Sequence, residues 1–367
     1  QTPQYFTGNT NLNEDLHGVV FTNNKTEWLN KAISIFKSDE FKANPLLTKV
    51  LAYTNKEVKE LNAIIRTKLF GKDAPRYVVG DMLMAYQSAM YDNDRWAGDS
   101  ALNNSLDYKV LAVEEGVFDL VDRGGNPTIK GFKGYKLTIE EVASPREKPS
   151  VFYVPSGKLP QQVIDIYNEL DRISDEIGRA TYVQYKRELM MMYSTVNAQV
   201  ENILLTEDLP NLNKPKKYKD DQGNTVYENL RDKSIDYGFA HTIHKSQGGT
   251  YQTVFVQDKN ISKAGKKVNG VWKPNHDTQT RLRYVGVSRA ENTSFVLSDS
   301  TKTITDPIMQ KRQRDALDSN KPLISTGNES TVVTPTDTSE LVSSKLSPEN
   351  EMIHNDNVEK LTPILNK

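Results

Sequence analysis

Residues 47–71, LTKVLAYTNKEVKELNAIIRTKLFG, form the clearest strand-to-helix unit in the first third of the chain. Residues 50–53 are apolar and predict a short buried strand. The following helix is predicted from apolar side chains at helical spacing, namely Val58, Leu61, Ile65 and Leu69. Thr54 and Glu57 have the spacing of a capping box, and Gly71 is placed to end the helix.

Two segments before this unit follow the same order. Residues 18–21 (GVVF) predict a buried strand, and residues 25–41 (KTEWLNKAISIFKSDEF) predict a helix whose apolar positions are Trp28, Ile33 and Phe36. Strand, helix, strand, helix is the order in which an α/β layer begins. The sequence therefore predicts an α/β fold.

An inserted region with a different pattern follows. Residues 77–158 contain short β-branched and aromatic runs separated by turn signals such as GGNP at 124–127, which predicts a small antiparallel barrel or sheet of roughly five strands. Residues 159–205 predict a helical hairpin, in which Met190 to Met192 are expected to pack. The lysine-rich stretch 213–224 is predicted to be a loop, and the α/β pattern resumes near residue 233.

These patterns divide the chain into consecutive segments. The last segment is rich in Ser, Thr, Pro and Asn and is predicted to be a disordered tail. The predicted division is 1–76 and 233–302 for the two parts of the α/β domain, 77–158 for the inserted β domain, 159–232 for the helical tower and its loop, 303–321 for a terminal helix, and 322–367 for the tail.

Composition limits the classes of function only weakly. The 367 residues carry a formal net charge of −1, so nucleic-acid binding would have to use local basic patches. The absence of cysteine excludes disulfides and thiolate metal sites. No long apolar run or leader is evident, so we expect a cytoplasmic protein without a membrane partner.

Residues 241–257, HTIHKSQGGTYQTVFVQ, place polar and glycine residues directly before a strand. Four of them offer donors suited to phosphate contacts and base stacking, namely Thr242, His244, Lys245 and Gln247. Gly248 and Gly249 would let backbone N–H groups approach an anion closely. A plain turn is the structural alternative.

A metal site is the other alternative for the same stretch. His241 and His244 have a spacing that can bring two imidazoles together, but no cysteine and no adjacent carboxylate completes a ligand set. We therefore expect no metal site, and His241 is as easily explained by packing within a turn.

A second polar stretch lies about forty residues further on. Residues 281–297, RLRYVGVSRAENTSFVL, predict a short helix that ends near Ser288 and Arg289 and is followed by a buried strand. An arginine fixed between a helix and a sheet can stabilise charge on a transferring phosphoryl group. A surface ion pair is the ordinary alternative for a single arginine.

Together these motifs resemble the second RecA-like domain of superfamily 1B DNA helicases, the branch that contains RecD and the Dda-type phage helicases. The stretch from Thr242 to Gly248 is similar to motif V of that family, and the stretch from Tyr284 to Ala290 is similar to motif VI. The unit containing Thr54, Asn55, Asn62 and Arg66 looks like the strand, "TN" and helix element of the same family. The resemblance implies a RecA-like domain with an inserted SH3-like barrel and a helical tower.

The resemblance also implies roles for individual residues. The DNA-contacting set would be Thr54, Asn55, Asn62, Thr242, His244 and Lys245. The nucleotide-facing set would be Gln247, Gly248, Thr250 and Arg289, with Arg289 as the catalytic arginine finger. The implied activity is ATP-dependent translocation on single-stranded DNA in the 5′ to 3′ direction, in replication or repair, in a bacterial or phage-infected cell.

One departure from the family limits this expectation. No G-x-x-x-x-G-K-[ST] sequence occurs in the chain, so ATP and Mg²⁺ would be held mainly by an N-terminal RecA-like lobe of the same protein. We therefore expect a C-terminal helicase part that is inactive alone. The alternatives are a non-catalytic module that binds nucleic acid or a replication or recombination protein, and a RecD-like subunit of a helicase–nuclease.

Overall fold

The computed structural model describes most of the chain up to the predicted tail. The described residues are 8–90, 100–122, 125–145, 149–206, 215–219, 225–229, 233–268 and 271–318. The predicted tail at 322–367 lies outside them. None of the helices in these segments is long and apolar enough to cross a membrane.

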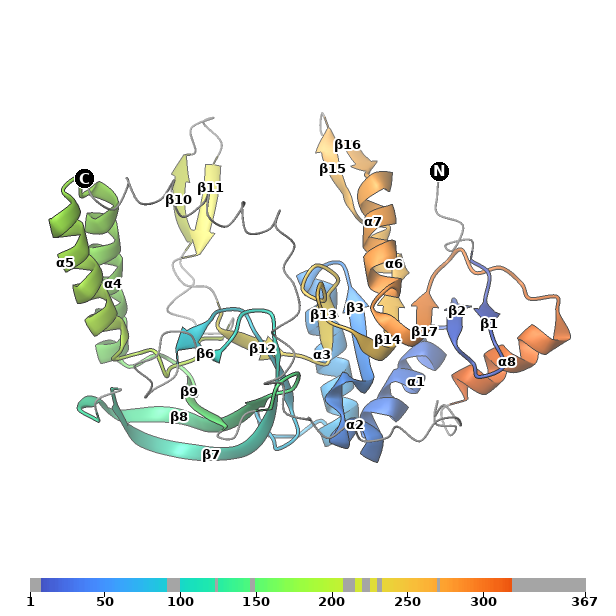
Figure 1. Cartoon of the computed structure of the whole chain (residues 1–367), viewed down its shortest axis with the longest axis horizontal. Helices are drawn as coiled ribbons and strands as arrows, with labels where there is room; N and C mark the ends of the chain where they lie inside the picture. Colours follow the sequence, from blue (N-terminus) through green and yellow to red (C-terminus); the bar gives the residue numbers. More distant parts are fainter. Residues whose placement is uncertain are drawn as a thin grey trace, which may run out of the picture. The chain divides into compact units, whose positions relative to one another are not determined.

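A six-stranded sheet forms the centre of the α/β part (Figure 1). Its strands lie in the order β1 (Asn11–Leu12), β2 (Gly18–Thr22), β17 (Ala290–Leu297), β14 (Tyr251–Gln257), β3 (Thr48–Ala52) and β13 (Ala240–Thr242). All neighbouring pairs are parallel except β1 with β2. The predicted α/β class with a parallel sheet is therefore confirmed.

Alternate side chains of these strands are buried on opposite faces of the sheet. Val50 and Ala52 of β3 pack in one core with helices on that side, and Leu51 packs in a second core on the other side. The first face is covered by α1 (Lys25–Lys37), α2 (Asp39–Ala43), α3 (Asn55–Phe70) and α8 (Pro307–Leu317). The second face is covered by α6 (Asp258–Ile261), α7 (His276–Val287) and the loop at 243–250. Both faces are buried, as parallel strands require.

The helix predicted at 25–41 is broken into two. Ser38 adopts an extended conformation that ends α1, and its side chain accepts a hydrogen bond from Phe41 N at the start of α2. The break lets Phe36 and Phe41 meet edge to face with ring centroids 4.9 Å apart. A short 3-10 turn, Pro45–Leu47, then leads into β3.

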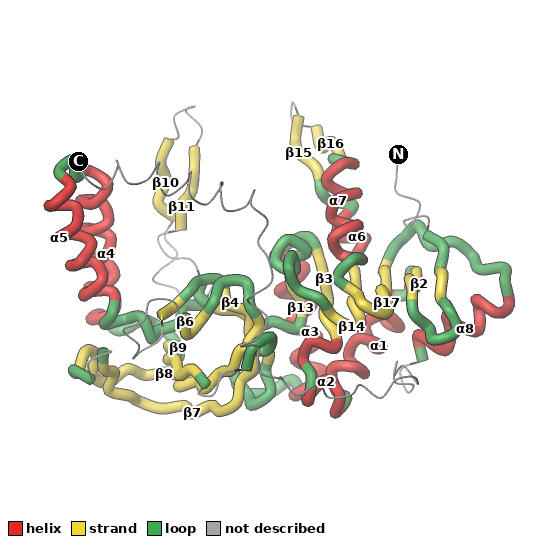
Figure 2. Tube along the Cα trace, in the orientation of Figure 1, coloured by secondary structure: helices red, strands yellow, loops and turns green. Residues whose placement is uncertain are grey.

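The inserted region is an antiparallel sheet of five strands (Figure 2). The strands lie in the order β12 (Ile235–Tyr237), β4 (Met82–Ala85), β7 (Asp107–Val121), β8 (Pro127–Glu141) and β9 (Ser150–Pro155). The segment 202–205 lies between the two outer strands, because Leu204 N donates to Tyr153 O of β9 and Ser234 N donates to Leu205 O. The segment thus bridges β9 and the start of β12, so the sheet curves toward the closed barrel that the sequence predicts.

The position of β12 shifts one predicted boundary. Residues 235–237 pair with β4 of the antiparallel sheet, although the sequence division assigns them to the second part of the α/β domain. The chain therefore leaves the inserted sheet only at about Gly238, whose N–H donates to Met82 O.

Two helices, α4 (Gln161–Arg179) and α5 (Val183–Asn197), form the predicted hairpin. Val163, Tyr167 and Leu170 of α4 are buried in a core shared with the inserted sheet. Met190 to Met192 are instead 51%, 63% and 46% exposed, so the expectation that they pack is wrong.

Three two-stranded hairpins complete the described structure. They are β5 (Ala89–Met90) with β6 (Ser100–Leu102), β10 (Pro215–Lys219) with β11 (Thr225–Asn229), and β15 (Gly265–Val268) with β16 (Val271–Pro274). The lysine-rich stretch predicted as a loop thus contains strand β10.

Candidate nucleic-acid interface

The carboxyl ends of β3 and β13 bring two predicted DNA-binding segments together. The strands are parallel neighbours, with Thr242 opposite Ala52, so both chains leave the sheet at the same edge. Asn55 and His244 are exposed there, and the rings of Tyr53 and His244 lie with centroids 6.1 Å apart. Tyr53 was not among the predicted site residues, although its place at the end of a predicted strand could have indicated it.

Thr54 begins helix α3 at this edge. Its hydroxyl oxygen accepts a hydrogen bond from Glu57 N at 3.3 Å, as the predicted capping box requires. The second half of the box is replaced, because Thr54 N donates to Asn260 Oδ1 at 2.8 Å rather than to Glu57. The Asn260 side chain also accepts from Tyr53 N at 2.8 Å, so it holds the turn that presents Asn55. Nothing in the local sequence pattern indicates this role of Asn260.

The loop at 243–250 starts from Thr242. Thr242 is 8% exposed, and its hydroxyl oxygen accepts from Lys245 N at 3.3 Å. Ser246 Oγ donates to Ile243 O at 2.8 Å, which closes the same turn. These bonds turn His244 outward, so Thr242 shapes the loop while His244 is its accessible member.

Lys245 connects this loop to the inserted sheet. Its Nζ donates to Asn104 Oδ1 at 2.9 Å and to Ser105 Oγ at 3.0 Å. The ammonium also lies 5.1 Å from the centre of the Tyr86 ring. Burial, and secondarily the charge of Lys233, lowers the pKa of Lys245. The cation is thus held in place by neutral groups, which leaves its charge available to an anion.

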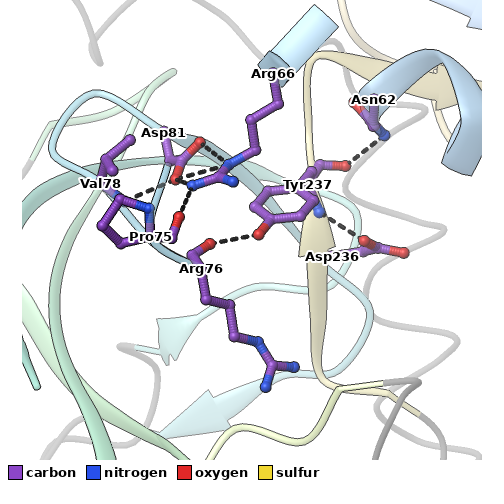
Figure 3. A network of polar contacts seen from close by, with 8 residues as sticks. All are labelled: Asn62, Arg66, Pro75, Arg76, Val78, Asp81, Asp236 and Tyr237. Carbon is purple, nitrogen blue, oxygen red and sulfur yellow. Dashed lines mark hydrogen bonds and ion pairs between the residues drawn. The ribbon is translucent and has the colours of Figure 1, made fainter. Parts of the chain in front are cut away.

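Asn62 has a structural place instead. It is 2% exposed, and its amide nitrogen donates to Tyr237 O at 2.8 Å (Figure 3). The same nitrogen donates to Ala240 O at 3.0 Å. Its amide oxygen accepts from Ala240 N at 2.7 Å. Because the side chain joins α3 to the chain between β12 and β13, we leave Asn62 out of the proposed DNA-binding set.

The same region holds an ion pair between α3 and the inserted sheet. Arg66 Nε lies 2.9 Å from Asp81 Oδ1, and its guanidinium carbon lies 4.8 Å from the centre of the Tyr237 ring (Figure 3). The Tyr237 hydroxyl donates to Arg76 O. Burial raises the pKa of Asp81, although Arg66 opposes that shift, and burial also raises the pKa of Tyr237 to about 12. This ion pair explains why an arginine occupies position 66.

The predicted nucleotide-facing residues gather at the opposite, amino edge of the sheet. Strands β14 and β17 both begin there, with Tyr251 opposite Ala290. Arg289 Nη1 donates to Gly249 O at 3.2 Å, and Arg289 Nε donates to Val285 O at 3.3 Å. Gly248 has a φ of 89°, a conformation that favours glycine. Gln247 and Thr250 are exposed beside it.

The two predicted sets are therefore separate in space. The DNA candidates lie at the carboxyl edge, the phosphate candidates lie at the amino edge, and the loop at 243–250 runs between them. Arg289 lies in the turn between α7 and β17. Its hydrogen bond to Gly249 O reaches across to the loop at 243–250, a contact that the turn itself does not require.

A buried charged network lies under this loop. Asp107 at the start of β7 contacts Lys49 Nζ of β3 at 2.9 Å and His241 Nε2 of β13 at 2.8 Å. Within the described residues neither Asp107 Oδ1 nor His241 Nε2 has a hydrogen-bond partner of good geometry, and both atoms are buried. Lys49 also donates to Gly238 O at 2.7 Å, and its ammonium lies 5.5 Å from the centre of the Tyr251 ring.

The charges of this network follow from burial. Burial alone would raise the pKa of Asp107, but His241 and Lys49 lower it to about 2. Burial lowers the pKa of His241, an effect that Asp107 opposes and Lys49 supports. The network is therefore a buried Asp107–Lys49 ion pair with the His241 imidazole packed against the same carboxylate.

The lowered pKa of His241 predicts a loss of stability in mild acid. Below the unfolded-state pKa near 6.5, the unfolded chain binds a proton that the folded chain excludes, so stability falls as the pH falls. We expect the free energy of unfolding to decrease from pH 7 to pH 5, and the decrease to be smaller in His241→Gln. Urea unfolding at several pH values measures both slopes. Equal slopes in the two proteins would contradict the lowered pKa of His241.

No family model matches the chain, and no curated protein matches it. The solved structures that it is similar to include Pif1 helicases. The chain matches a Bacteroides Pif1 helicase in complex with ADP-AlF3 and single-stranded DNA at 13% identity and a TM-score of 0.31, over 78% of this chain and 49% of that chain. It matches the Candida albicans Pif1 helicase at 13% identity and a TM-score of 0.30, over 78% of this chain and 56% of that chain. It thus spans about half the length of these helicases.

Proposed function

We propose that this chain binds single-stranded DNA as the C-terminal part of an ATP-dependent 5′ to 3′ superfamily 1B helicase. The observation that carries the proposal is the meeting of exposed Asn55 and His244 beside Tyr53 at one sheet edge. Rings and amides can stack on bases and contact phosphates without reading sequence. Lys245 adds a fixed positive charge next to this edge.

The amino edge supports the nucleotide part of the proposal. Arg289 is half-buried, and two carbonyl oxygens hold its guanidinium in one orientation. Such an arginine fits the γ-phosphate of an ATP molecule whose other contacts come from a second lobe. Gln247, Gly248 and Thr250 would line the same phosphate, while Mg²⁺ would be held by that second lobe.

The loop at 243–250 suggests how the two events are linked. It begins at the proposed DNA edge and ends at Gly249, whose carbonyl accepts from Arg289. A shift of the loop upon DNA binding would change the position of the arginine. We propose that this loop couples strand binding to ATP turnover.

Binding of single-stranded DNA by this chain tests the proposal. Fluorescence anisotropy with a labelled oligothymidine should show an affinity that falls with salt, because phosphate contacts release counterions. His244→Ala should weaken binding about tenfold, the loss expected for one stacking contact. His17→Ala is the matched control and should leave affinity unchanged. Equal affinities for all three proteins would remove His244 from the interface.

A further inference from the structure

The β15–β16 hairpin carries an unusual set of side chains. Residues 263–275 read KAGKKVNGVWKPN and contain four lysines and no acidic residue. Lys263, Lys266 and Lys273 are exposed, and Trp272 is 50% exposed. Within the described part of the chain no carboxylate pairs with these three lysines. The hairpin is therefore a local positive field with an accessible aromatic ring.

The pairing of the strands separates these groups onto two faces. Lys266 lies directly opposite Lys273, and Trp272 belongs to the other face because side chains alternate along a strand. A Cβ on Gly265 would clash with Lys273 O and come within 2.9 Å of the Trp272 ring, so this glycine makes room for both the backbone of the paired strand and the indole. The ring is thus supported on one side by backbone and is open on the other.

This arrangement is unfavourable for the hairpin in isolation. Like charges directly opposite each other destabilise an antiparallel pair, and a two-stranded hairpin without a core is only marginally stable. The apolar surface of an exposed tryptophan adds a further unfavourable free energy in water. A nucleic-acid strand that crosses the edge of the hairpin would relieve both costs, since its phosphates would neutralise the lysines on one face and a base would cover the indole on the other.

The base of the hairpin is fixed next to the proposed DNA edge. Asn275 N donates to Ala264 O at 3.0 Å, and Gln279 Nε2 donates to the same oxygen at 3.0 Å. Ala264 is fully buried, and it follows closely on Asn260, whose side chain holds the Tyr53–Thr54 turn. Four residues per strand extend the hairpin by about 13 Å, or about two nucleotides of a strand.

We propose that the β15–β16 hairpin is a second binding site for single-stranded nucleic acid, in which Trp272 stacks on a base and Lys266 and Lys273 contact phosphates. This site rests on the proposed function. It would extend the path of the bound nucleic-acid strand beyond the sheet edge at Asn55 and His244. It adds affinity without sequence preference, because every base has a face on which an indole can stack.

The lysines and the tryptophan give separable signals in a binding experiment on the whole chain. Removing two phosphate contacts with Lys266→Ala/Lys273→Ala should lower the slope of log affinity against log salt by about 1.4. Lys130→Ala/Lys133→Ala removes two exposed charges from β8 and should leave the slope unchanged. Equal slopes for both double variants would overturn the phosphate contacts.

The stacking contact is tested with ligands that differ only in their bases. Trp272→Leu should weaken oligothymidine binding about tenfold, and Trp272→Phe should retain most of the affinity, because both keep an apolar side chain but only Phe stacks. An abasic oligonucleotide of the same length should bind all three proteins equally. Equal binding of oligothymidine by Trp272→Leu and the unchanged chain would overturn the stacking site.

These experiments also distinguish a failure of the hairpin site from a failure of the proposed function. Loss of affinity in His244→Ala but not in the hairpin variants refutes the hairpin alone. Loss in the hairpin variants but not in His244→Ala supports the hairpin and refutes the sheet edge. An unchanged chain that does not bind oligothymidine at low salt refutes both.

Discussion

Asp107→Asn is expected to lower the free energy of unfolding by about 3–5 kcal/mol, the loss typical of a broken buried ion pair. The substitution keeps the size of the side chain but removes the negative charge that faces Lys49 Nζ at 2.9 Å. Lys49 is 1% exposed, so its ammonium would remain buried without a counter-charge. Urea unfolding followed by circular dichroism measures the loss.

Two further variants show whether the charge itself is responsible. Lys49→Met/Asp107→Leu removes both charges, so it should be markedly more stable than Asp107→Asn alone. Asp39→Asn removes an exposed carboxylate that pairs with Lys42 and should leave the midpoint unchanged. An Asp107→Asn protein that unfolds at the same urea concentration as the unchanged chain would contradict the buried pair.

Arg289→Ala is expected to have the largest effect on activity. In a two-lobed protein with an ATP-binding lobe ahead of Gln1, the substitution should lower DNA-stimulated ATP turnover by about 10³-fold or more, as for other arginine fingers. Affinity for single-stranded DNA should change little, because Arg289 lies at the opposite edge of the sheet from His244. Steady-state phosphate release and anisotropy measure the two effects.

Arg281→Ala is the matched control for this prediction. Arg281 lies on α7, the helix that ends just before Arg289. Its side chain is exposed and pairs with Asp277 at 3.0 Å on the surface. The Arg281→Ala protein should keep ATP turnover within about twofold of the unchanged protein, since an exposed ion pair of this kind contributes little to stability. Turnover that survives Arg289→Ala would mean that this arginine only ties the loop to α7.

Local signals predicted much of the fold correctly. The apolar spacing in α3, the hydroxyl of Thr54 and the glycine at position 71 specify the start, buried face and end of that helix within one stretch of sequence. Turn signals likewise located the inserted antiparallel strands. These features depend on neighbours in the chain, which is why periodicity finds them.

Features that depend on distant contacts escaped prediction. Phe36, next to the break of the first helix at Ser38, packs edge to face against the distant Phe239 with ring centroids 5.4 Å apart. The closing segment at 202–205 and strand β12 join the inserted sheet from beyond the tower. No pattern local to these residues encodes such pairings, because the partner strands lie far away in the sequence.

The candidate site likewise combines features that local sequence indicates with features that only distant contacts determine. Motif spacing assigned the 54–55 and 242–245 segments to one predicted site, and parallel pairing of β3 with β13 brings them to one edge. The backbone bonds of Asn62 and the contact of Asp107 with Lys49 required the tertiary structure. The amide of Asn62 is equally suited to DNA and to a buried carbonyl, and sequence alone does not distinguish them.

Cross-linking of DNA to the chain tests the central claim most directly. An oligothymidine containing 4-thiothymidine would be bound to the protein at low salt and irradiated, and the attached peptides would be identified by mass spectrometry. The account predicts cross-links within 53–55 and 242–245, at the carboxyl edge of the parallel sheet. Cross-links confined to the α1, α2 and α8 face, with none at that edge, would contradict it.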